Sequence, residues 1–270
     1  MKSVKDKIVL ITGGTNGIGR IMALDFAERG AKVVVWGRNP EALREMEEAG
    51  RSKGRFIKAM GCDVSDRAAV YRAADQVKKE AGPVDILINN AGVVSGATIL
   101  DTPDEKIANT IAVNTLALFW TTKAFLPDML ARNEGHLVTI ASAAGILGVT
   151  GLADYSASKF GAFGYHEAIT MELQKKKTAV KTTLVCPYYI DTGMFEGVKT
   201  RFPLLLPILK SENTARRIVK AVLNNRRLLV MPSFVRNIFW LRMLPASLFD
   251  GTIGFLGINS TMDHFTGRKQ

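Results

Sequence analysis

Tyr155 and Lys159 stand four residues apart within the stretch YSASK, and their side chains are of types that can move a proton. On a helix this spacing places both side chains on one face, about one turn apart. A nearby ammonium favours the ionised form of a phenol, so the pair predicts a tyrosine whose pKa is lowered toward working pH. Such a tyrosine can exchange a proton with an alcohol or carbonyl oxygen. The same spacing also fits an amphipathic helix with a lysine that reaches solvent, so the catalytic interpretation depends on the segments upstream.

A glycine-rich turn near the N-terminus indicates a second functional region. The apolar run Lys7–Thr12 leads into GGTNGIG, and a periodic apolar segment follows up to Gly30. This order predicts strand, turn and helix, where backbone amides at the helix N-terminus can approach a diphosphate. An ordinary glycine-rich loop is the plainer alternative. The residues of the turn expected to contact a dinucleotide are Gly13, Thr15, Asn16, Gly17, Ile18 and Gly19.

The remaining apolar runs predict a doubly wound α/β fold. Strand-like runs at 32–36, 55–60, 84–88, 136–140, 180–185 and 228–231 alternate with helical patterns. This alternation predicts a single Rossmann-type domain with a mostly parallel, seven-stranded sheet and helices on both faces. The length of 270 residues and the 47% hydrophobic content suit one domain with a full core. We expect the domain to cover 1–270, with a substrate lid at 188–212 and a C-terminal extension at 232–270.

Taken together, these motifs resemble the short-chain dehydrogenase/reductase family over nearly the whole chain. The matching segments, in order, are TGGTNGIG (12–19), CDV (62–64), NNAG (89–92), VN (113–114), the serine of ASAAG (142) and YSASK (155–159). The resemblance implies a catalytic tetrad of Asn114, Ser142, Tyr155 and Lys159. Tyr155 would be the general acid or base, and Lys159 would hold the nicotinamide ribose and lower the tyrosine pKa. Ser142 would hydrogen-bond the reacting oxygen, while Asn114 would hold a water that relays protons.

The resemblance also implies further cofactor contacts, and it has one clear departure. Where the family usually has Pro-Gly after the sixth strand, this chain has Pro187 and Tyr188, which brings a bulky ring toward the pocket entrance. Besides the tetrad's Tyr155 and Lys159, the residues expected to border the cofactor on this basis are Asp63, Val64, Asn90, Ala91, Gly92, Pro187, Ile190 and Thr192.

Cofactor choice is predicted from the end of the second strand. An acidic residue there would bond the adenosine ribose and repel a 2′-phosphate. This chain instead has Gly37, followed by Arg38 and Asn39, and a guanidinium pairs well with a phosphate. We therefore expect NADP(H) in preference to NAD(H). The alternative is that Arg38 merely caps a loop.

Motifs in the second half of the chain narrow the resemblance. They are most similar to the membrane-associated group of NADPH-dependent retinal reductases, retinol dehydrogenases and 17β-hydroxysteroid dehydrogenases, which implies a lipophilic aldehyde, ketone or alcohol as substrate. Apolar residues at the predicted carboxyl ends of strands agree with such a substrate. The motifs that carry the likeness are 119–127, 194–197, 201–203, 215–217 and 262–268. The candidate substrate-pocket residues are Val94, Ala143, Leu147, Val149, Tyr188, Tyr189, Met194 and Phe195.

Other functions stay open at this point. The same fold and tetrad serve 3-oxoacyl thioester reductases, and a non-catalytic binding protein could also use the fold, although such proteins usually lose part of the tetrad. The net charge of +11 raises the question of nucleic acid, yet no recognised nucleic-acid motif accompanies it, so no nucleic-acid partner is expected. The three histidines lack metal-ligand spacing, and we expect no metal site.

Charge and hydropathy bear on location. The polar start, Met1–Lys7, does not read as a signal peptide, and no run of 18 uncharged apolar residues is present. The two cysteines, Cys62 and Cys186, fit buried thiols of a reducing compartment. We therefore expect a cytoplasmic protein.

From 199 to 242, ten basic residues and one acidic residue are interleaved with Phe, Trp and Leu, which favours peripheral contact with an anionic membrane.

Two long helical patterns predict self-association. The segments 104–131 and 155–174 are apolar on more than one side. In the resembled family the corresponding helices pair across a two-fold axis into a four-helix bundle. We therefore expect a homodimer or a homotetramer.

Overall fold

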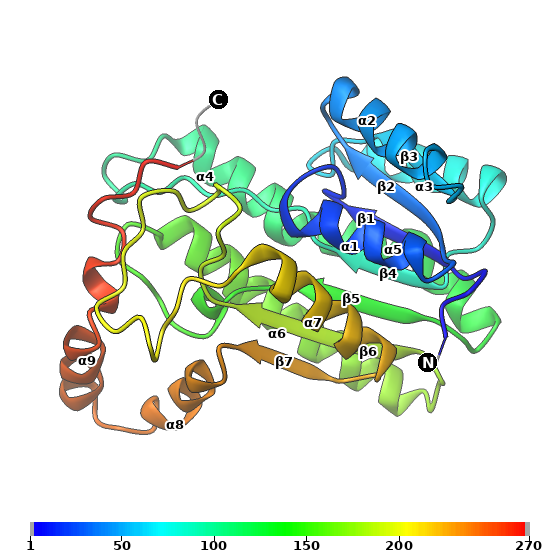
Figure 1. Cartoon of the computed structure of the whole chain (residues 1–270). Helices are drawn as coiled ribbons and strands as arrows, with labels where there is room; N and C mark the ends of the chain where they lie inside the picture. The colour runs from blue at the N-terminus through cyan, green and yellow to red at the C-terminus, as the bar shows by residue number, and fades with distance from the viewer. Residues whose placement is uncertain (1–2, 268–270) are drawn as a thin grey trace.

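The protein is described from a computed structural model that places residues 3–267, and it is built around one parallel sheet (Figure 1). The strand order is β3-β2-β1-β4-β5-β6-β7, and every neighbouring pair is parallel. The predicted doubly wound fold is confirmed. The strands are β1 (Ile8–Thr12), β2 (Lys32–Gly37), β3 (Ile57–Gly61), β4 (Ile86–Asn89), β5 (His136–Ile140), β6 (Lys181–Pro187) and β7 (Leu228–Met231).

Helices cover both faces of the sheet, since each face carries its own apolar cluster. On one face, strand residues pack against α1 (Gly17–Glu28), α2 (Pro40–Arg51) and α7 (Ser211–Leu223). On the other face, the alternate strand residues pack against α3 (Arg67–Glu80), α5 (Ala117–Ala131) and α6 (Ala153–Lys175). Successive residues of a strand point to opposite faces, so strands that are buried on both sides become continuous apolar runs. This pattern explains why the strands could be recognised in the sequence.

The predicted helix at 104–131 is present but is interrupted by a π-helical turn. α4 (Asp104–Ile111) passes into the π-helix η1 (Ala112–Leu116), which leads directly into α5. Such wide turns inside α-helices frequently lie at functional sites. Here the turn carries Asn114, whose side chain is buried.

The segments after β6 and β7 gather at the carboxyl ends of the strands. The long connection after β6 lies beside a chain of short helices that follows β7 (Figure 1). An apolar cluster joins them through Leu206, Val235, Ile238 and Ile253. The division into a lid at 188–212 and an extension at 232–270 stays a prediction. The helices after β7 are η3 (Ser233–Asn237), α8 (Ile238–Leu241), α9 (Ala246–Phe255) and η4 (Ile258–Ser260). A further short helix, η2 (Ala143–Gly145), follows β5.

No helix within residues 3–267 combines the length and the apolar character needed to cross a bilayer.

Candidate functional site

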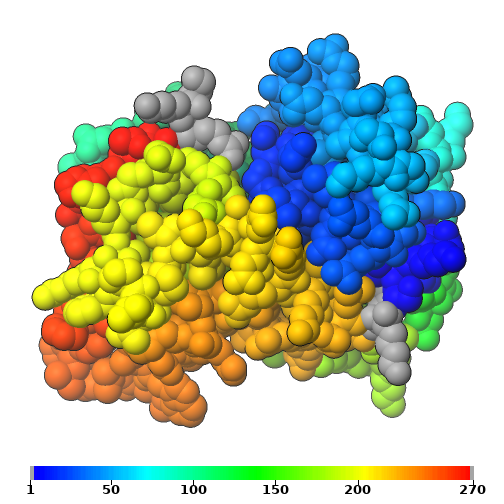
Figure 2. All heavy atoms as spheres, in the orientation of Figure 1, coloured from blue at the N-terminus to red at the C-terminus, as the bar shows by residue number. Residues whose placement is uncertain are grey.

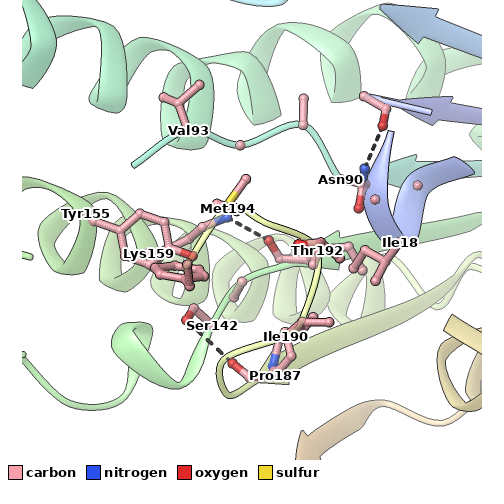
Figure 3. A pocket seen from close by; sticks show the side chains of 18 of the residues that line it. Ile18, Asn90, Val93, Ser142, Tyr155, Lys159, Pro187, Ile190, Thr192 and Met194 are labelled. Atoms are coloured by element: carbon pink, nitrogen blue, oxygen red, sulfur yellow. Dashed lines mark hydrogen bonds between the residues drawn. The ribbon is translucent and has the colours of Figure 1, made fainter. Parts of the chain in front are cut away.

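A cavity of about 340 Å³ opens at the carboxyl ends of the strands, where parallel α/β sheets place their ligands (Figure 3). It brings together the glycine turn, the ends of β2 to β6, the start of α6 and the loops after β6 and β7. All of the predicted catalytic, cofactor and substrate residues line it except two. The exceptions, Asn114 and Val94, lie behind its wall.

The glycine turn forms a tight cradle at one end of the cavity. Gly13 and Gly17 have φ angles of +63° and +52°, which favour glycine. At Gly19 a Cβ atom would collide with the carbonyl oxygen of Gly13. The side-chain amide of Asn90 donates to the carbonyl oxygens of Thr12 at 3.0 Å and Gly13 at 3.1 Å, which ties the turn to the end of β4 (Figure 3).

The start of α1 suits an anion. Its N-cap residue, Asn16, makes no side-chain capping hydrogen bond, and no acidic residue lies in the first turn. The first amides of a helix have no partner within the helix, and the helix dipole favours negative charge beside them. A diphosphate would therefore find amide donors there without a competing side chain. The residues present fit the dinucleotide that the sequence predicts.

The end of β2 forms the adenosine side of this cradle. Asn39 is occupied as the N-cap of α2, where its side chain accepts hydrogen bonds from two amides. Arg38 instead extends along the cavity edge, with a guanidinium nitrogen 3.5 Å from a carboxylate oxygen of Asp63. Burial would raise the pKa of Asp63, yet hydrogen bonds from Ser65 and the charge and hydrogen bond of Arg38 hold it below its usual value. Because Arg38 is mostly exposed, its side chain can turn toward a ligand phosphate.

The catalytic candidates lie at the centre of the cavity. Tyr155 and Lys159 share one face of α6, and the Lys159 ammonium nitrogen is 5.7 Å from the centre of the Tyr155 ring. Lys159 donates a hydrogen bond of 2.9 Å to the carbonyl oxygen of Ile140 at the end of β5. Ser142, just after β5, donates a hydrogen bond of 3.5 Å from its hydroxyl to the carbonyl oxygen of Pro187, and its side chain lies near enough to the Tyr155 phenol to lower the pKa of that phenol. The strand ends of β5 and β6 therefore fix all three groups around one point (Figure 3).

The electrostatics of this pair correct one expectation from the sequence. Burial raises the pKa of Tyr155 to about 12, although the hydrogen bond with Ser142 acts in the opposite direction. Burial also lowers the pKa of Lys159 to about 8. The predicted lowering of the tyrosine pKa by Lys159 is therefore not found in the protein without ligand. Desolvation outweighs the ammonium because Lys159 itself is buried and turned toward a backbone carbonyl.

Asn114 stands one layer behind the cavity. Its side-chain oxygen accepts from the amide of Val93 at 2.9 Å, and its nitrogen donates to the Val93 carbonyl and to the Ser158 hydroxyl, each at 2.9 Å. The side chain therefore fixes the backbone that follows the NNAG motif against α6. Lys159 lies close by, because a Cβ atom on Gly92 would be 3.5 Å from its nitrogen and 3.4 Å from the Asn114 oxygen. The role of Asn114 in holding a water stays a prediction.

The far end of the cavity is apolar and partly built by residues that the sequence did not single out. Val94 packs from behind the wall against the apolar cluster to which Tyr155 and Tyr189 belong. Tyr188, which replaces the usual glycine, lines the cavity, and its buried hydroxyl has no hydrogen-bond partner within residues 3–267. Over the cavity as a whole, the lining residues that the sequence did not assign to the site are Trp36, Cys62, Val113, Ile140, Ala141, Ala144, Leu152, Leu206, Val235, Ile238 and Ile258.

Some of the missed residues had a signal in the sequence and others had none. Trp36, Cys62 and Ile140 are next to predicted site residues or strand ends, so proximity along the chain could have found them. Val235, Ile238 and Ile258 reach the cavity only because the chain after β7 folds back over it. No local sequence pattern predicts that the chain after β7 folds back in this way.

The fold and this site define an oxidoreductase of the Rossmann type, and comparison with known proteins gives its family. The family model described as "short chain dehydrogenase" matches residues 7–201 of this chain. The chain belongs to the short-chain dehydrogenase/reductase family, whose members bind a nicotinamide cofactor. It is 48% identical over 272 residues to epidermal retinol dehydrogenase 2 of Mus musculus, a match that covers 100% of this chain and 88% of that protein. It is 40% identical over 293 residues to retinol dehydrogenase 10-B of Danio rerio, covering 100% and 87%.

Solved structures agree on the fold and differ in their cofactor. A short-chain dehydrogenase/reductase from Burkholderia phymatum in complex with NAD has a TM-score of 0.81 and 26% identity, covering 90% of this chain and 95% of that chain. A metagenomic short-chain oxidoreductase in complex with NADP has a TM-score of 0.70 and 27% identity, covering 84% and 96%. The chain is therefore an oxidoreductase close to the retinol dehydrogenase group, and these neighbours do not decide between the two cofactors.

Proposed function

We propose that this chain is an NADP(H)-dependent reductase or dehydrogenase that acts on lipophilic aldehydes, ketones or alcohols of retinoid or steroid type. The observation that carries the proposal is the division of the cavity. Its charged lining residues, Arg38, Asp63 and Lys159, lie at the predicted cofactor end and beside the catalytic tyrosine. The described residues that line the other end are uncharged and mostly apolar, which suits a substrate with one polar group on a large apolar body.

The side chains support a simple proton transfer. A bound nicotinamide would supply or accept the hydride at the carbonyl carbon. Tyr155 would donate its proton to the carbonyl oxygen during reduction and take it back during oxidation. Ser142 would hold the same oxygen by a hydrogen bond, since its hydroxyl already lies beside the Tyr155 phenol. Lys159, charged at neutral pH with a pKa of about 8, would stabilise the phenolate that forms.

The choice of NADP(H) is supported by the end of β2. Arg38 lines the cavity edge beside Gly37, and its only ion pair there is the long contact with Asp63 within the described residues. A 2′-phosphate would offer that guanidinium a better partner than the exposed carboxylate. Gly37 also leaves no room for an acidic side chain, because a Cβ atom there would be 2.7 Å from the methyl group of Thr15.

A cofactor-oxidation screen tests this function. Purified protein would be assayed with NADPH and with NADH against retinal, steroid ketones, long-chain aldehydes and 3-oxoacyl thioesters. We expect the fastest oxidation with NADPH and an apolar aldehyde or ketone. A preference for the thioesters would favour the alternative 3-oxoacyl reductase, and a lack of turnover with every carbonyl, together with intact nucleotide binding, would favour a binding protein.

We propose further that the cavity mouth contacts a membrane surface. Around the mouth, large apolar side chains are exposed on the loop after β6, on the helices α8 and α9, and on the connection between these helices. This set is called the apolar rim here. These segments form one continuous surface, yellow to orange-red in Figure 2. The contact between Phe202 and Phe255, with ring centres 5.5 Å apart, joins them. The apolar rim comprises Leu204, Leu205, Ile208, Phe239, Trp240, Met243, Leu244, Leu248 and Phe255.

The basic residues of 199–242 contribute less to this surface than the sequence predicts. Arg226 and Arg227 precede β7, so they lie at the opposite end of the sheet from the cavity. Others belong to α7, which packs on α1. Four of the basic residues lie in the segments that form the rim, namely Lys199, Arg201, Arg236 and Arg242. Each would contribute about 1 kcal/mol to the free energy of binding to an anionic surface. Apolar insertion should therefore outweigh charge.

Liposome co-sedimentation tests the membrane proposal. We expect the protein to pellet with liposomes that contain phosphatidylserine, more weakly but still measurably at high salt. Trp240→Ser with Met243→Ser should abolish pelleting, because these side chains are 73% and 76% exposed on the rim. Phe56→Ser is the matched control, since Phe56 is 46% exposed just before β3 at the far end of the sheet. Wild-type protein that stays in the supernatant at low salt would contradict the proposal.

Self-association is the last part of the proposal. α5 and η1 expose Leu116 and Phe119, and α6 exposes Phe160 and Met171. Exposed apolar side chains on two neighbouring helices suit pairing with the same helices of a second copy. We expect a dimer or tetramer by light scattering, and a monomer at micromolar concentration would contradict it.

A further inference from the structure

The segment Thr261–Gly267, called the C-terminal strap here, folds back over the loop that follows β6. In Figure 1 this red segment runs beside the yellow loop. The backbone amide of Thr266 donates to the carbonyl oxygen of Glu196 at 2.9 Å, and the amide of Lys199 donates to that of Thr261 at 3.2 Å. The Thr261 hydroxyl is buried and lies 2.9 Å from the phenol oxygen of Tyr189, which lines the cavity. The strap is therefore bonded to the wall of the substrate end.

Two glycines outside the strap make this close packing possible. At Gly197, with φ of +85°, a Cβ atom would collide with the carbonyl oxygen of His264. At Gly96, with φ of +68°, a Cβ atom would collide with the ring of Phe265. Both glycines belong to loops at the cavity end of the sheet, the first after β6 and the second after β4. The strap therefore sits directly on the backbone of two loops that surround the substrate end.

A row of rings connects the strap to the catalytic tyrosine. The Phe265 ring centre is 6.5 Å from that of Phe195, which is in turn 5.6 Å from the ring centre of Tyr155 in an edge-on arrangement. Phe195 also packs against Tyr189 at 5.1 Å. Edge-to-face and tilted contacts of this kind favour fixed ring orientations. Phe265 does not line the cavity itself, and its ring contact with Phe195 connects it to Tyr155.

We propose that the C-terminal strap is a positioning element of the active site, in which Phe265 holds Phe195 against Tyr155 and closes the substrate end to water. This inference rests on the proposed function, because it assigns the strap a role in that reaction. Phe265 is a positioning residue and Tyr155 remains the catalytic residue. The strap lies outside residues 7–201, which match the family model, although the retinol dehydrogenases named above match the chain over its whole length.

Water exclusion gives the proposal a distinctive consequence. Tyr155 is 5% exposed, and burial is the main reason that its pKa is raised. Removing the Phe265 ring would loosen Phe195 and admit water beside the phenol. Hydration favours phenolate, so the pKa of Tyr155 would fall. Since Tyr155 donates its proton during reduction, the alkaline limit of activity would move to lower pH.

The test compares four variants in carbonyl reduction and in hydrogen exchange. Phe265→Ala removes the ring, Phe265→Leu keeps apolar bulk, and Gly197→Ala lifts the strap from the opposite side. Gly254→Ala is the matched control, because a Cβ atom there meets nothing within 4 Å in the nearby helix α9. The readouts are kcat/KM with a lipophilic aldehyde, the pH profile, the thermal midpoint, and the amide exchange of 193–199 in the protein alone.

Phe265→Ala and Gly197→Ala should lower kcat/KM about tenfold or more, shift the alkaline limit to lower pH, and speed the exchange of 193–199. Phe265→Leu should recover most of the loss, and Gly254→Ala should match the wild type. Unchanged kcat/KM, or a loss that follows the thermal midpoint with no shift in pH profile or exchange, would overturn the proposal. If the wild type itself reduces no carbonyl, the proposed function fails. In that case, unchanged amide exchange of 193–199 in Phe265→Ala would separately overturn the proposal that the strap holds this loop.

Discussion

The two ends of the cavity are built by different means. The proposed cofactor end is made mainly of backbone and short side chains from the turn after β1 and from the ends of the neighbouring strands. The substrate end is assembled from loops after β5 and β6 and from residues after β7 that lie far apart in sequence. The first end depends on glycines that a motif reveals, whereas the second depends on how distant segments pack. For this reason the catalytic and nucleotide-binding motifs can be recognised in this sequence more readily than the residues that would bind the substrate.

The largest effect should come from the point where the two ends meet. Tyr155→Phe removes the proton donor while the ring can still pack against Phe195. General acid–base catalysis contributes about 10²–10⁴-fold, so turnover should fall by that order. Nucleotide binding, measured by fluorescence titration, should remain. If the variant keeps half of the wild-type turnover, Tyr155 is not the proton donor.

The cofactor end can be blocked selectively. Gly19→Ala places a Cβ atom against the carbonyl oxygen of Gly13, so the cradle must deform. We expect nucleotide affinity to fall at least about tenfold, which corresponds to about 1.4 kcal/mol. Gly61→Ala at the end of β3 is the control, because a Cβ atom there meets nothing within 4 Å. Equal affinities for the two variants would show that the turn does not hold the nucleotide.

The preference for one cofactor over the other tests a single residue of the cofactor end, Arg38. Arg38→Leu should lower the preference for NADPH over NADH by roughly tenfold or more, because a hydrogen bond to a charged group contributes about 1.5–3 kcal/mol. The value of kcat/KM with NADH should hardly change. Replacing Gly37 by Asp would be a poor test, since its Cβ atom would press on Thr15 and disturb the glycine turn. A wild type that prefers NADH would contradict the assignment of Arg38.

A smaller effect concerns stability and pH. The folded pKa of Lys159 is about 8 against an ordinary value of 10.5, so between these values the unfolded chain binds more protons. Stability therefore rises with pH across that window on account of this residue. The difference in denaturant midpoint between Lys159→Met and wild type should be largest near pH 7 and shrink toward pH 10.5. A difference that is independent of pH would mean that Lys159 is not desolvated.

Much of the fold could be predicted from the sequence because its signals are local. Apolar runs gave the strands to within about two residues, since a strand buried on both faces must be apolar throughout. The cradle residues, Ser142, Tyr155 and Lys159 carry motifs, and the structure brings them to one cavity. The position of Asn114 behind the wall depends on a π-helical turn that periodicity does not reveal.

The remainder depends on tertiary packing. The predicted pKa of Tyr155 took account of a neighbouring charge but not of complete burial, which only the assembled core imposes. Likewise, Arg226 and Lys199 belong to the same basic stretch of sequence but lie toward opposite ends of the sheet. Composition could not separate them, and for that reason the apolar rim carries fewer basic side chains than the whole stretch 199–242.

The central claim is that one cavity places a nicotinamide beside the carbonyl carbon of a lipophilic substrate. The most direct measurement is hydride transfer from NADPH deuterated at C4 to retinal, followed by mass spectrometry of the product. The account predicts retinol that carries deuterium at the former carbonyl carbon with wild-type protein and hardly any with Tyr155→Phe. Retinol that carries no deuterium when either hydrogen at C4 is labelled, or equal labelling with Tyr155→Phe, would contradict it.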